Sequence, residues 1–275
     1  MNPYNSVSIA PRQLLKSLMI NRRLIYQMAK REVIGRYRGS VLGLAWSFFN
    51  PLIMLVVYTF VFSFVFKSRW QTGSDSKTEF ALALFIGMIV HGLLAECVNR
   101  APSLIVGNVN YVKKVIFPLE VLPWIAMGAT LFHTLISLVV WGLFFVLVNQ
   151  TFYWTALFLP LLFLPLILIT MGLTWFLASF GVYLRDVGQI TGVFTMVLLF
   201  MSPVFYPISN LPESIQPLMY ANPLTFFIEQ SRAVLMWGQF PNWGGLLISL
   251  LISMVVAWMG FAWFQKTRRG FADVL

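Results

Sequence analysis

Six long apolar stretches most constrain what this chain can fold into. Residues 41–66 form the first, with 26 consecutive positions that carry no Asp, Glu, Lys or Arg. A helix needs about 20 apolar residues to cross the hydrocarbon core of a bilayer. The sequence therefore predicts an all-α polytopic membrane protein with six transmembrane helices, at residues 41–66, 80–98, 119–148, 154–180, 191–206 and 243–264.

The same pattern excludes a soluble globular domain. Charged residues make up 10% of the chain, against about 25% in a typical soluble domain. No cleavable signal peptide is expected, because the first apolar run starts after residue 40 and has no small-residue cleavage site behind it. The single Cys97 excludes an internal disulfide framework. His91 and His133 each stand alone in apolar stretches, where packing or pore lining is expected rather than metal binding.

The distribution of positive charge orients the chain. Of 19 Lys and Arg residues, 15 fall in the N-terminal segment, loops 99–118 and 181–190, and the C-terminal tail. Cytoplasmic loops carry an excess of Lys and Arg, so both termini are predicted to lie in the cytoplasm. Eight of the 19 precede residue 39. With a net charge of +10 distributed in this way, the chain is expected to contact anionic membrane lipids and not nucleic acid.

Residues 1–38 are predicted to contain a cytoplasmic interface helix. Within residues 11–34, one broad helical face is apolar and carries Leu14, Leu15, Leu18, Ile25, Met28 and Val33. Basic residues gather on the opposite face, with Arg22 as an exception, and Arg31, Arg36 and Arg38 lie toward the end of the segment. A cationic amphipathic helix of this kind lies along a membrane surface. The alternative is a solvated basic tail.

Residues 203–241 are predicted to form an outer region of short re-entrant helices between spans five and six. The segment contains six of the 14 prolines, yet it stays substantially apolar from Leu218 to Trp237. Broken helices are tolerated at membrane depth only where protein or a cavity covers the backbone.

Ionisable residues near membrane depth offer no energy-coupling site. Each carboxylate is expected to pair with a neighbouring base: Glu96 with Arg100, Asp186 with Arg185, and Glu229 with Arg232. The sequence lacks the GxxxxGKS/T phosphate cradle and the GxSxG and HExxH motifs. No catalytic, cofactor-binding or metal-binding residue is therefore assigned, and a pump built from this chain would need energy from another subunit.

The start of the first span carries two further signals. Gly39 and Gly43 are four residues apart and are expected to allow close helix approach, either at the turn into the span or against a neighbouring helix. Asn50-Pro51 frees a backbone carbonyl one turn earlier and is expected to bend the span.

Four stretches, in order along the chain, carry a resemblance to a known family. They are RYRGSVLGLAWSFFNPL from Arg36, NYVKKVIFP from Asn110, YLRD from Tyr183, and SPVFYP from Ser202 with NPLT at Asn222 and the following segment to Arg232. With them the chain resembles the permease subunits of polysaccharide ABC exporters, the type-2 ABC permeases of the Wzm, KpsM and TagG kind. The RYRGSVLG opening is closer to O-antigen and teichoic-acid permeases than to the capsule branch.

The resemblance implies a multi-pass permease subunit of an ATP-driven transporter that exports a lipid-linked polysaccharide across the bacterial cytoplasmic membrane. It implies a homodimeric channel joined to two copies of an ABC nucleotide-binding ATPase subunit, which would bind ATP and Mg. O-antigen is the first expected substrate, with capsule polysaccharide or teichoic acid next. The alternatives are a polytopic membrane glycosyl- or acyltransferase, whose expected cluster of Asp, Glu or His is missing from the sequence, and a membrane scaffold.

Loop 99–118 is the expected contact for the ATPase subunit. It lies on the predicted cytoplasmic side and surrounds its lysines with apolar residues, which a merely solvated loop would not need. The ATPase-coupling candidates in this loop and the next cytoplasmic loop are Asn110, Tyr111, Lys113, Lys114, Arg185 and Asp186.

Aromatic residues supply candidates for a polysaccharide path. Their rings present apolar faces to sugars, and Tyr and Trp add a hydrogen-bonding edge. The channel-lining candidates are Trp46, Phe49, Asn50, Tyr58 and Phe62. The candidates for an outer gate in the re-entrant region are Phe205, Tyr206, Tyr220 and Asn222. Helix packing and lipid contact are the alternatives for all of them.

Overall fold

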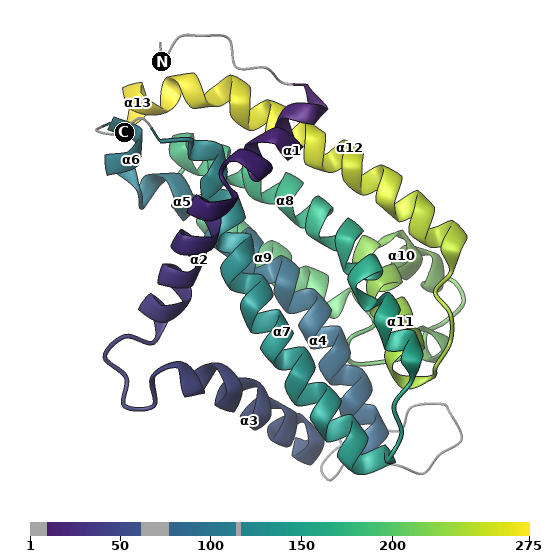
Figure 1. Ribbon diagram of the computed structural model, residues 1–275. Coiled ribbons are helices and arrows are strands. Elements are labelled where there is room, and N and C mark those ends of the chain that lie inside the picture. Colours follow the sequence, from purple (N-terminus) through teal and green to yellow (C-terminus); the bar gives the residue numbers. More distant parts are fainter. Residues whose placement is uncertain (1–9, 62–76, 114–116) are drawn as a thin grey trace.

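The computed structural model describes residues 10–61, 77–113 and 117–275. Within these ranges all regular secondary structure is helical (Figure 1), which confirms the all-α prediction. The α-helices are α1 Pro11–Ile20, α2 Arg22–Arg36, α3 Trp46–Phe60, α4 Lys77–Arg100, α5 Ser103–Val106, α6 Val109–Lys113, α7 Leu122–Asn149, α8 Leu159–Tyr183, α9 Val187–Phe200, α10 Gln216–Ala221, α11 Pro223–Met236, α12 Trp243–Thr267 and α13 Phe271–Val274. Short 3₁₀ turns join some of them: η1 Gly43–Ala45, η3 Leu119–Val121, η4 Trp154–Phe158, η5 Ile208–Asn210 and η6 Arg268–Gly270.

Five segments of the described chain are long and apolar enough to cross a bilayer. They are Gly43–Phe60, Thr78–Arg100, Leu119–Asn149, Trp154–Tyr183 and Trp243–Val274. The predicted spans two, three, four and six each fall within one of these segments. The apolar helix α9 has 14 residues, fewer than the roughly 20 that a perpendicular crossing needs. The number of crossings and their orientation stay predictions.

The helix of the first predicted span begins later than expected. The prediction starts at residue 41, whereas α3 starts at Trp46 after a turn and η1. Gly39 and Gly43 form this turn with φ angles of +87° and +51°, which residues with a Cβ rarely adopt. An added Cβ would meet nothing within 4 Å at either position in the described chain, so the glycines serve the turn here. Residues 62–66 lie outside the described residues.

The fifth predicted span is displaced toward the N-terminus. The sequence places it at residues 191–206, but the helix runs from Val187 to Phe200. Pro203 disfavours helical backbone in the residue before it, and the Ser202 hydroxyl donates to the Leu198 carbonyl at 2.5 Å where the helix ends. Residues 201–206 therefore form turns.

The N-terminal amphipathic segment consists of two helices instead of one. Asn21 separates α1 from α2, and its Nδ2 donates to the Ser17 carbonyl at 2.9 Å, a local bond of the type that competes with helix continuation. The apolar face packs on the protein's own bundle, because Leu14, Ala29 and Val33 are buried. The predicted position of this segment along the membrane surface stays a prediction.

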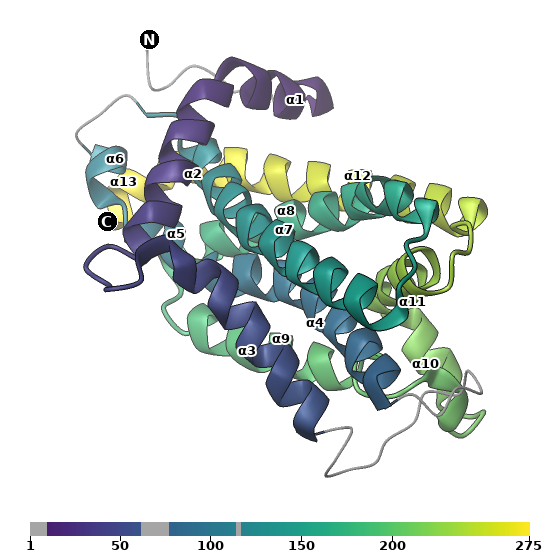
Figure 2. The same ribbon diagram turned by 60° about the horizontal axis from the view of Figure 1, so that its bottom comes forward.

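Helix α4 lies in the middle of the bundle. In its most apolar window 78% of the residues are buried, against 11% to 44% in the other four membrane-length segments of the described chain. Helices α3, α7, α8, α9 and α11 all contact it (Figure 2). A helix enclosed in this way is apolar on all sides, which is why its sequence shows little amphipathic period.

Helices α8 and α12 pack with their backbones in direct contact. A Cβ added to Gly260 would lie 2.0 Å from the Gly172 carbonyl oxygen, and one added to Gly172 would lie 2.5 Å from the Val256 oxygen. Small residues allow membrane helices to approach this closely. The α8–α12 contact therefore depends on glycine at both positions.

Both ends of the described chain lie at one end of the bundle, which we call the terminal end (Figure 1). Helices α1, α5, α6 and α13 gather there, and Arg268 forms an ion pair with Glu120 at 2.9 Å. At the opposite end, the backbone of Gln150 has a left-handed conformation. An aromatic cluster lies there too, in which Trp154 packs against Phe240 with ring centroids 5.2 Å apart.

Gly172→Ala should destabilise the protein by about 1–3 kcal/mol, because the new methyl group would overlap the α12 backbone. Thermal unfolding in detergent measures the effect. Gly142→Ala in α7 is the matched control, since nothing lies within 4 Å of its Cβ position; this change should be neutral or stabilising by up to about 1 kcal/mol. Equal effects of the two substitutions would contradict the packing described.

Candidate functional site

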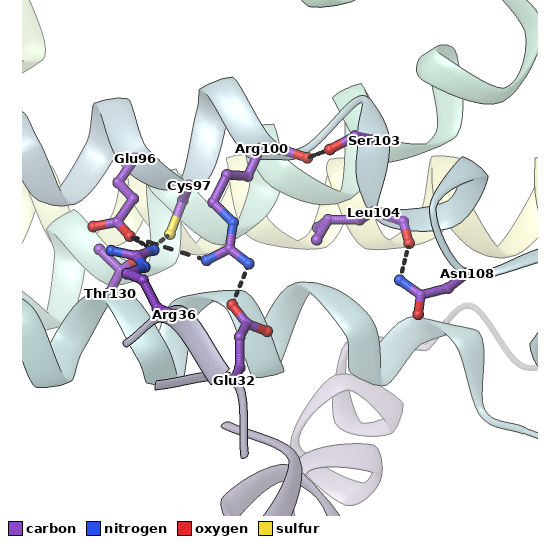
Figure 3. Close-up of polar contacts among 9 residues, drawn as sticks. All are labelled: Glu32, Arg36, Glu96, Cys97, Arg100, Ser103, Leu104, Asn108 and Thr130. Atoms are coloured by element: carbon purple, nitrogen blue, oxygen red, sulfur yellow. Dashed lines mark hydrogen bonds and ion pairs between the residues drawn. The ribbon is translucent and has the colours of Figure 1, made fainter. Parts of the chain in front are cut away.

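Four charged side chains join α2 to α4 (Figure 3). Glu32 and Arg36 lie one turn apart on α2, and Glu96 and Arg100 lie one turn apart on α4. Arg36 pairs with Glu96, and Arg100 pairs with Glu32. On each helix the Glu comes four residues before the Arg, and the Glu of each helix pairs with the Arg of the other. The two helices therefore run antiparallel at this point. We call these four residues the charge clasp.

The charge clasp contains one predicted pair and one that was not predicted. The expected pair of Glu96 with Arg100 along α4 is confirmed at 4.0 Å, and Glu96 has a closer partner in Arg36 of α2. Arg36 is the last residue of α2, and its guanidinium pairs with Glu96 of α4 while staying partly exposed. Arg31 and Arg38 are exposed, as the interface-helix prediction requires. Glu32 was not singled out in the sequence, because nothing local links it to Arg100.

The charge clasp leads directly into the loop at the terminal end. Arg100 is the last residue of α4, and its carbonyl accepts a hydrogen bond from the Ser103 hydroxyl at 2.9 Å (Figure 3). In the next turn, Asn108 Nδ2 donates to the Leu104 carbonyl at 2.9 Å. The neighbouring Cys97 thiol lies 3.5 Å from the Thr130 hydroxyl of α7. These contacts connect α2, α4, α5 and α7 at one place.

A polar cavity of about 300 Å³ lies between α3, α4 and α7, next to the charge clasp. Its polar lining consists of Arg36, Tyr37, Ser47, Asn50, Tyr58, Glu96, His133, Thr134 and Ser137. The cavity is large and polar enough to hold ordered water. Helix α3 therefore packs on the bundle partly across a polar space and not through a continuous apolar core.

The two histidines lie in different surroundings. His91 is buried, and its Nε2 lies 2.9 Å from the Thr195 carbonyl of α9. His133 lines the cavity with its Nδ1 3.4 Å from the Tyr37 hydroxyl. Burial raises the pKa of the Tyr37 hydroxyl, so this group keeps the proton that it can donate. Among the described residues, no group of three His, Cys, Asp or Glu side chains is arranged to hold a metal ion.

The channel-lining candidates do not share one surface. Asn50 and Tyr58 line the cavity with Pro51 between them. Phe49 is exposed on another side of α3, beside the exposed Phe48. Trp46 is half-buried at the start of the helix, and Phe62 lies outside the described residues. Among the described candidates, Asn50 and Tyr58 share the cavity, and a role of any of them in a channel stays a prediction.

Three of the four outer-gate candidates hold their own segment together. Asn222 caps α11 by accepting from the Leu224 backbone N–H at 3.0 Å, and its Nδ2 donates to the Met201 carbonyl at 2.9 Å. Tyr206 donates to the Phe200 carbonyl at 2.5 Å, and Phe205 stacks on Phe200. Tyr220 is exposed.

Arg232 makes several contacts that hold this outer segment together. The sequence predicted only one of them. The predicted pair with Glu229 is confirmed at 3.0 Å. Arg232 is also fully buried and donates to the carbonyls of Ala83, Pro203 and Val204 at 2.9, 2.7 and 3.1 Å. One guanidinium thus joins α11, the turn after α9 and the first half of α4.

The coupling candidates lie at the terminal end with different exposures. Asn110 and Lys113 are exposed on α6, and Lys114 lies outside the described residues. Tyr111 is partly buried and stacks on Phe117, with ring centroids 4.5 Å apart. Loop 99–118 packs directly on α8, because a Cβ on Gly181 of α8 would lie 2.2 Å from the Pro102 carbonyl oxygen.

Arg185 and Asp186 are exposed between α8 and α9. The sequence predicts an ion pair between them, but within the described part of the chain they form none. Neighbouring side chains point apart where backbone passes from one helix to the next, so adjacency in sequence did not bring the charges together. That prediction was wrong.

Arg232→Lys should destabilise the protein by about 2–4 kcal/mol, because buried carbonyls would lose their donor at about 1–3 kcal/mol each. Lysine keeps the charge but lacks the guanidinium donors that reach several carbonyls at once. Thermal unfolding and membrane yield measure the loss. Arg269→Lys, at an exposed position, should stay within about 0.5 kcal/mol; an equally mild effect at Arg232 would contradict the role assigned to it.

A double-mutant cycle tests the charge clasp. Arg36→Gln and Glu96→Gln should show a coupling of about 0.5–1 kcal/mol, because both side chains are partly exposed to solvent and screening reduces the attraction. Chemical unfolding in detergent provides the four stabilities. Arg185→Gln with Asp186→Asn is the matched control of adjacent, unpaired charges and should give a coupling near zero. A clasp coupling no larger than the control would refute the pairing.

Comparison with known proteins gives a consistent relationship over most of the chain. An O-antigen export system permease protein RfbA of Myxococcus xanthus is 28% identical over 263 residues, which cover 95% of this chain and 98% of that protein. A protein of the same name from Klebsiella pneumoniae is 23% identical over 254 residues, 92% of this chain and 95% of that protein. The capsule polysaccharide export inner-membrane protein CtrC of Neisseria meningitidis serogroup B is 23% identical over 261 residues, 93% of this chain and 95% of that protein.

The family relationship rests on a separate match. The family model described as ABC-2 type transporter matches residues 23–236. This match begins in α2 and ends with α11, so it contains the charge clasp, the polar cavity, the loop at the terminal end and Arg232. Because it covers well over half of the chain, the protein belongs to the ABC-2 type transporter family.

Proposed function

We propose that this chain is the permease subunit of an ATP-driven exporter that moves a lipid-linked polysaccharide across the bacterial cytoplasmic membrane. The observation that carries the proposal is its similarity, over 92% or more of its length, to permeases named for O-antigen and capsule export. O-antigen is the substrate that we favour, since the relative with 28% identity bears that name. Capsule polysaccharide is the second candidate, favoured by the similarity to CtrC.

Transport is favoured over the alternative of a glycosyl- or acyltransferase. The family to which the chain belongs is a transporter family, and its members are transport subunits, not enzymes. The sequence has no phosphate cradle for a nucleotide. We therefore assign ATP and Mg binding to a separate ATPase subunit, present in two copies beside a homodimer of this chain.

We assign the ATPase contact to the exposed face of α6 and to the turn that follows α8. Asn110, Lys113, Arg185 and Asp186 supply exposed polar groups there. Tyr111 has a supporting role in this proposal, because its stacking on Phe117 holds the loop in shape. This assignment places the terminal end in the cytoplasm, as the positive charge of the chain favours.

The path of the polymer remains part of the proposal. Phe49 and the exposed apolar face of α3 are suited to a channel between two copies of the chain. Asn50 and Tyr58 face the cavity within one copy, so we assign them to the movement of α3 relative to α4 and α7. A wall that shifts across a polar, hydrated space needs to break fewer dry contacts than one seated in an apolar core.

Co-expression with its ATPase subunit tests the function. The wild-type chain should co-purify with the ATPase and should be required for ATP hydrolysis in the membrane. Lys113→Glu should weaken co-purification about tenfold, equivalent to about 1.4 kcal/mol, because it reverses a charge on the proposed contact face.

Lys16→Glu, which reverses an exposed lysine on α1, is the control and should leave co-purification unchanged. Both variants should reach the membrane in wild-type amounts. A folded chain that carries out an enzymatic reaction alone, with no ATPase partner, would contradict the proposal.

A further inference from the structure

A second groove lies along α2. It has a volume of about 510 Å³ and lies between α1, α2 and α7. Its lining on α2 follows the helical period: Arg22, Ile25, Tyr26, Ala29, Lys30, Val33 and Ile34. Leu18 of α1, Leu44 of η1, and Gly128 and Phe132 of α7 complete it. The wall is therefore apolar, with two cations near its rim.

The floor of the groove is set by a close helix crossing. A Cβ added to Gly128 would lie 3.0 Å from the Ala29 Cβ, so α2 and α7 touch at this point. Around the opening, Tyr26, Ile34 and Leu44 are exposed. The apolar wall thus continues into apolar surface, which suits contact with the hydrocarbon of a bilayer and not with water.

The charges of the groove have one sign. Arg22 and Lys30 are among the eleven lining residues, and no carboxylate is. Within the described part of the chain neither cation forms an ion pair. Glu32, on the same helix, is turned away and engaged by Arg100 in the charge clasp.

This geometry accounts for the exception in the amphipathic pattern. A helix that only lay on a membrane would keep all its basic residues on the polar face. Arg22 departs from that face and instead lies at the rim of an apolar groove. A cation beside an apolar slot fits a ligand that is anionic at one end and apolar along its length.

We propose that the groove binds one anionic phospholipid, with its phosphate between Arg22 and Lys30 and an acyl chain along Ile25, Ala29 and Phe132. The lipid fills the groove between α1, α2 and α7 and so supports the helix that carries Glu32 and Arg36 of the charge clasp. A soluble anion would leave the apolar wall exposed to water, and a zwitterionic lipid would gain less from two cations. The inference does not depend on what the protein transports.

Lipid titration by native mass spectrometry of the full chain in detergent tests the site. Phosphatidylglycerol and phosphatidylcholine with identical acyl chains serve as the probes. The wild type should bind one phosphatidylglycerol about 30-fold more tightly than phosphatidylcholine, about fivefold for each cation near the headgroup. Arg22→Gln with Lys30→Gln should abolish this preference.

Arg23→Gln with Arg31→Gln is the matched control, because it removes two exposed charges from the same helix outside the groove. The control should keep the preference for phosphatidylglycerol. Ile25→Trp fills the groove and should weaken the binding of both lipids. This variant provides a second test of the site if the charge variant fails to fold. Thermal unfolding of each variant reports on folding.

Three results would overturn the proposal. The first is equal binding of the two lipids by the wild type, and the second is an equal loss of preference in the matched control. The third is displacement of phosphatidylglycerol by inorganic pyrophosphate alone, because the site would then recognise a free phosphate group and not a lipid.

Discussion

The position of α2 is the constraint on which the neighbouring elements depend. The helix packs along α7, where Ala29 meets Gly128, and the pairing of Glu32 with Arg100 and of Arg36 with Glu96 joins it to α4. The charged pairs leave no net charge between α2 and α4. The chain then turns through two left-handed glycines directly into α3, so the position of α3 follows from that of α2. The polar cavity beside α3 and the apolar groove along α2 both have residues of α2 in their lining.

Arg232 joins other elements to α4 toward the opposite end of this helix. A polypeptide broken by prolines at membrane depth leaves carbonyls that water does not reach, and one buried guanidinium satisfies those of Pro203 and Val204 together with Ala83 of α4. Helix α4 therefore carries an arginine-centred contact near each end and is enclosed between them. In the proposed exporter, α4 is the element that connects the ATPase side with the outer segment.

Local patterns in the sequence were sufficient for the helices and for contacts within one turn. Uncharged runs located three of the membrane-length segments within a few residues at both ends and the start of a fourth, and a spacing of three predicted the pair of Glu229 with Arg232. Contacts across the bundle were beyond such patterns, since Arg36 and Glu96 are 60 residues apart and Arg232 is 149 residues from Ala83. The break at Asn21 was missed because a side-chain bond to Ser17, not a change in apolar period, separates α1 from α2.

The most direct test of the account is transport in proteoliposomes that contain this chain and its ATPase subunit. Lipid-linked O-antigen is supplied on the side where ATP is added, and polymer that becomes protected from an added glycosidase is measured. We predict protection that requires ATP hydrolysis, the ATPase subunit and this chain together. A folded complex that hydrolyses ATP yet protects neither O-antigen nor capsule polysaccharide would contradict the account.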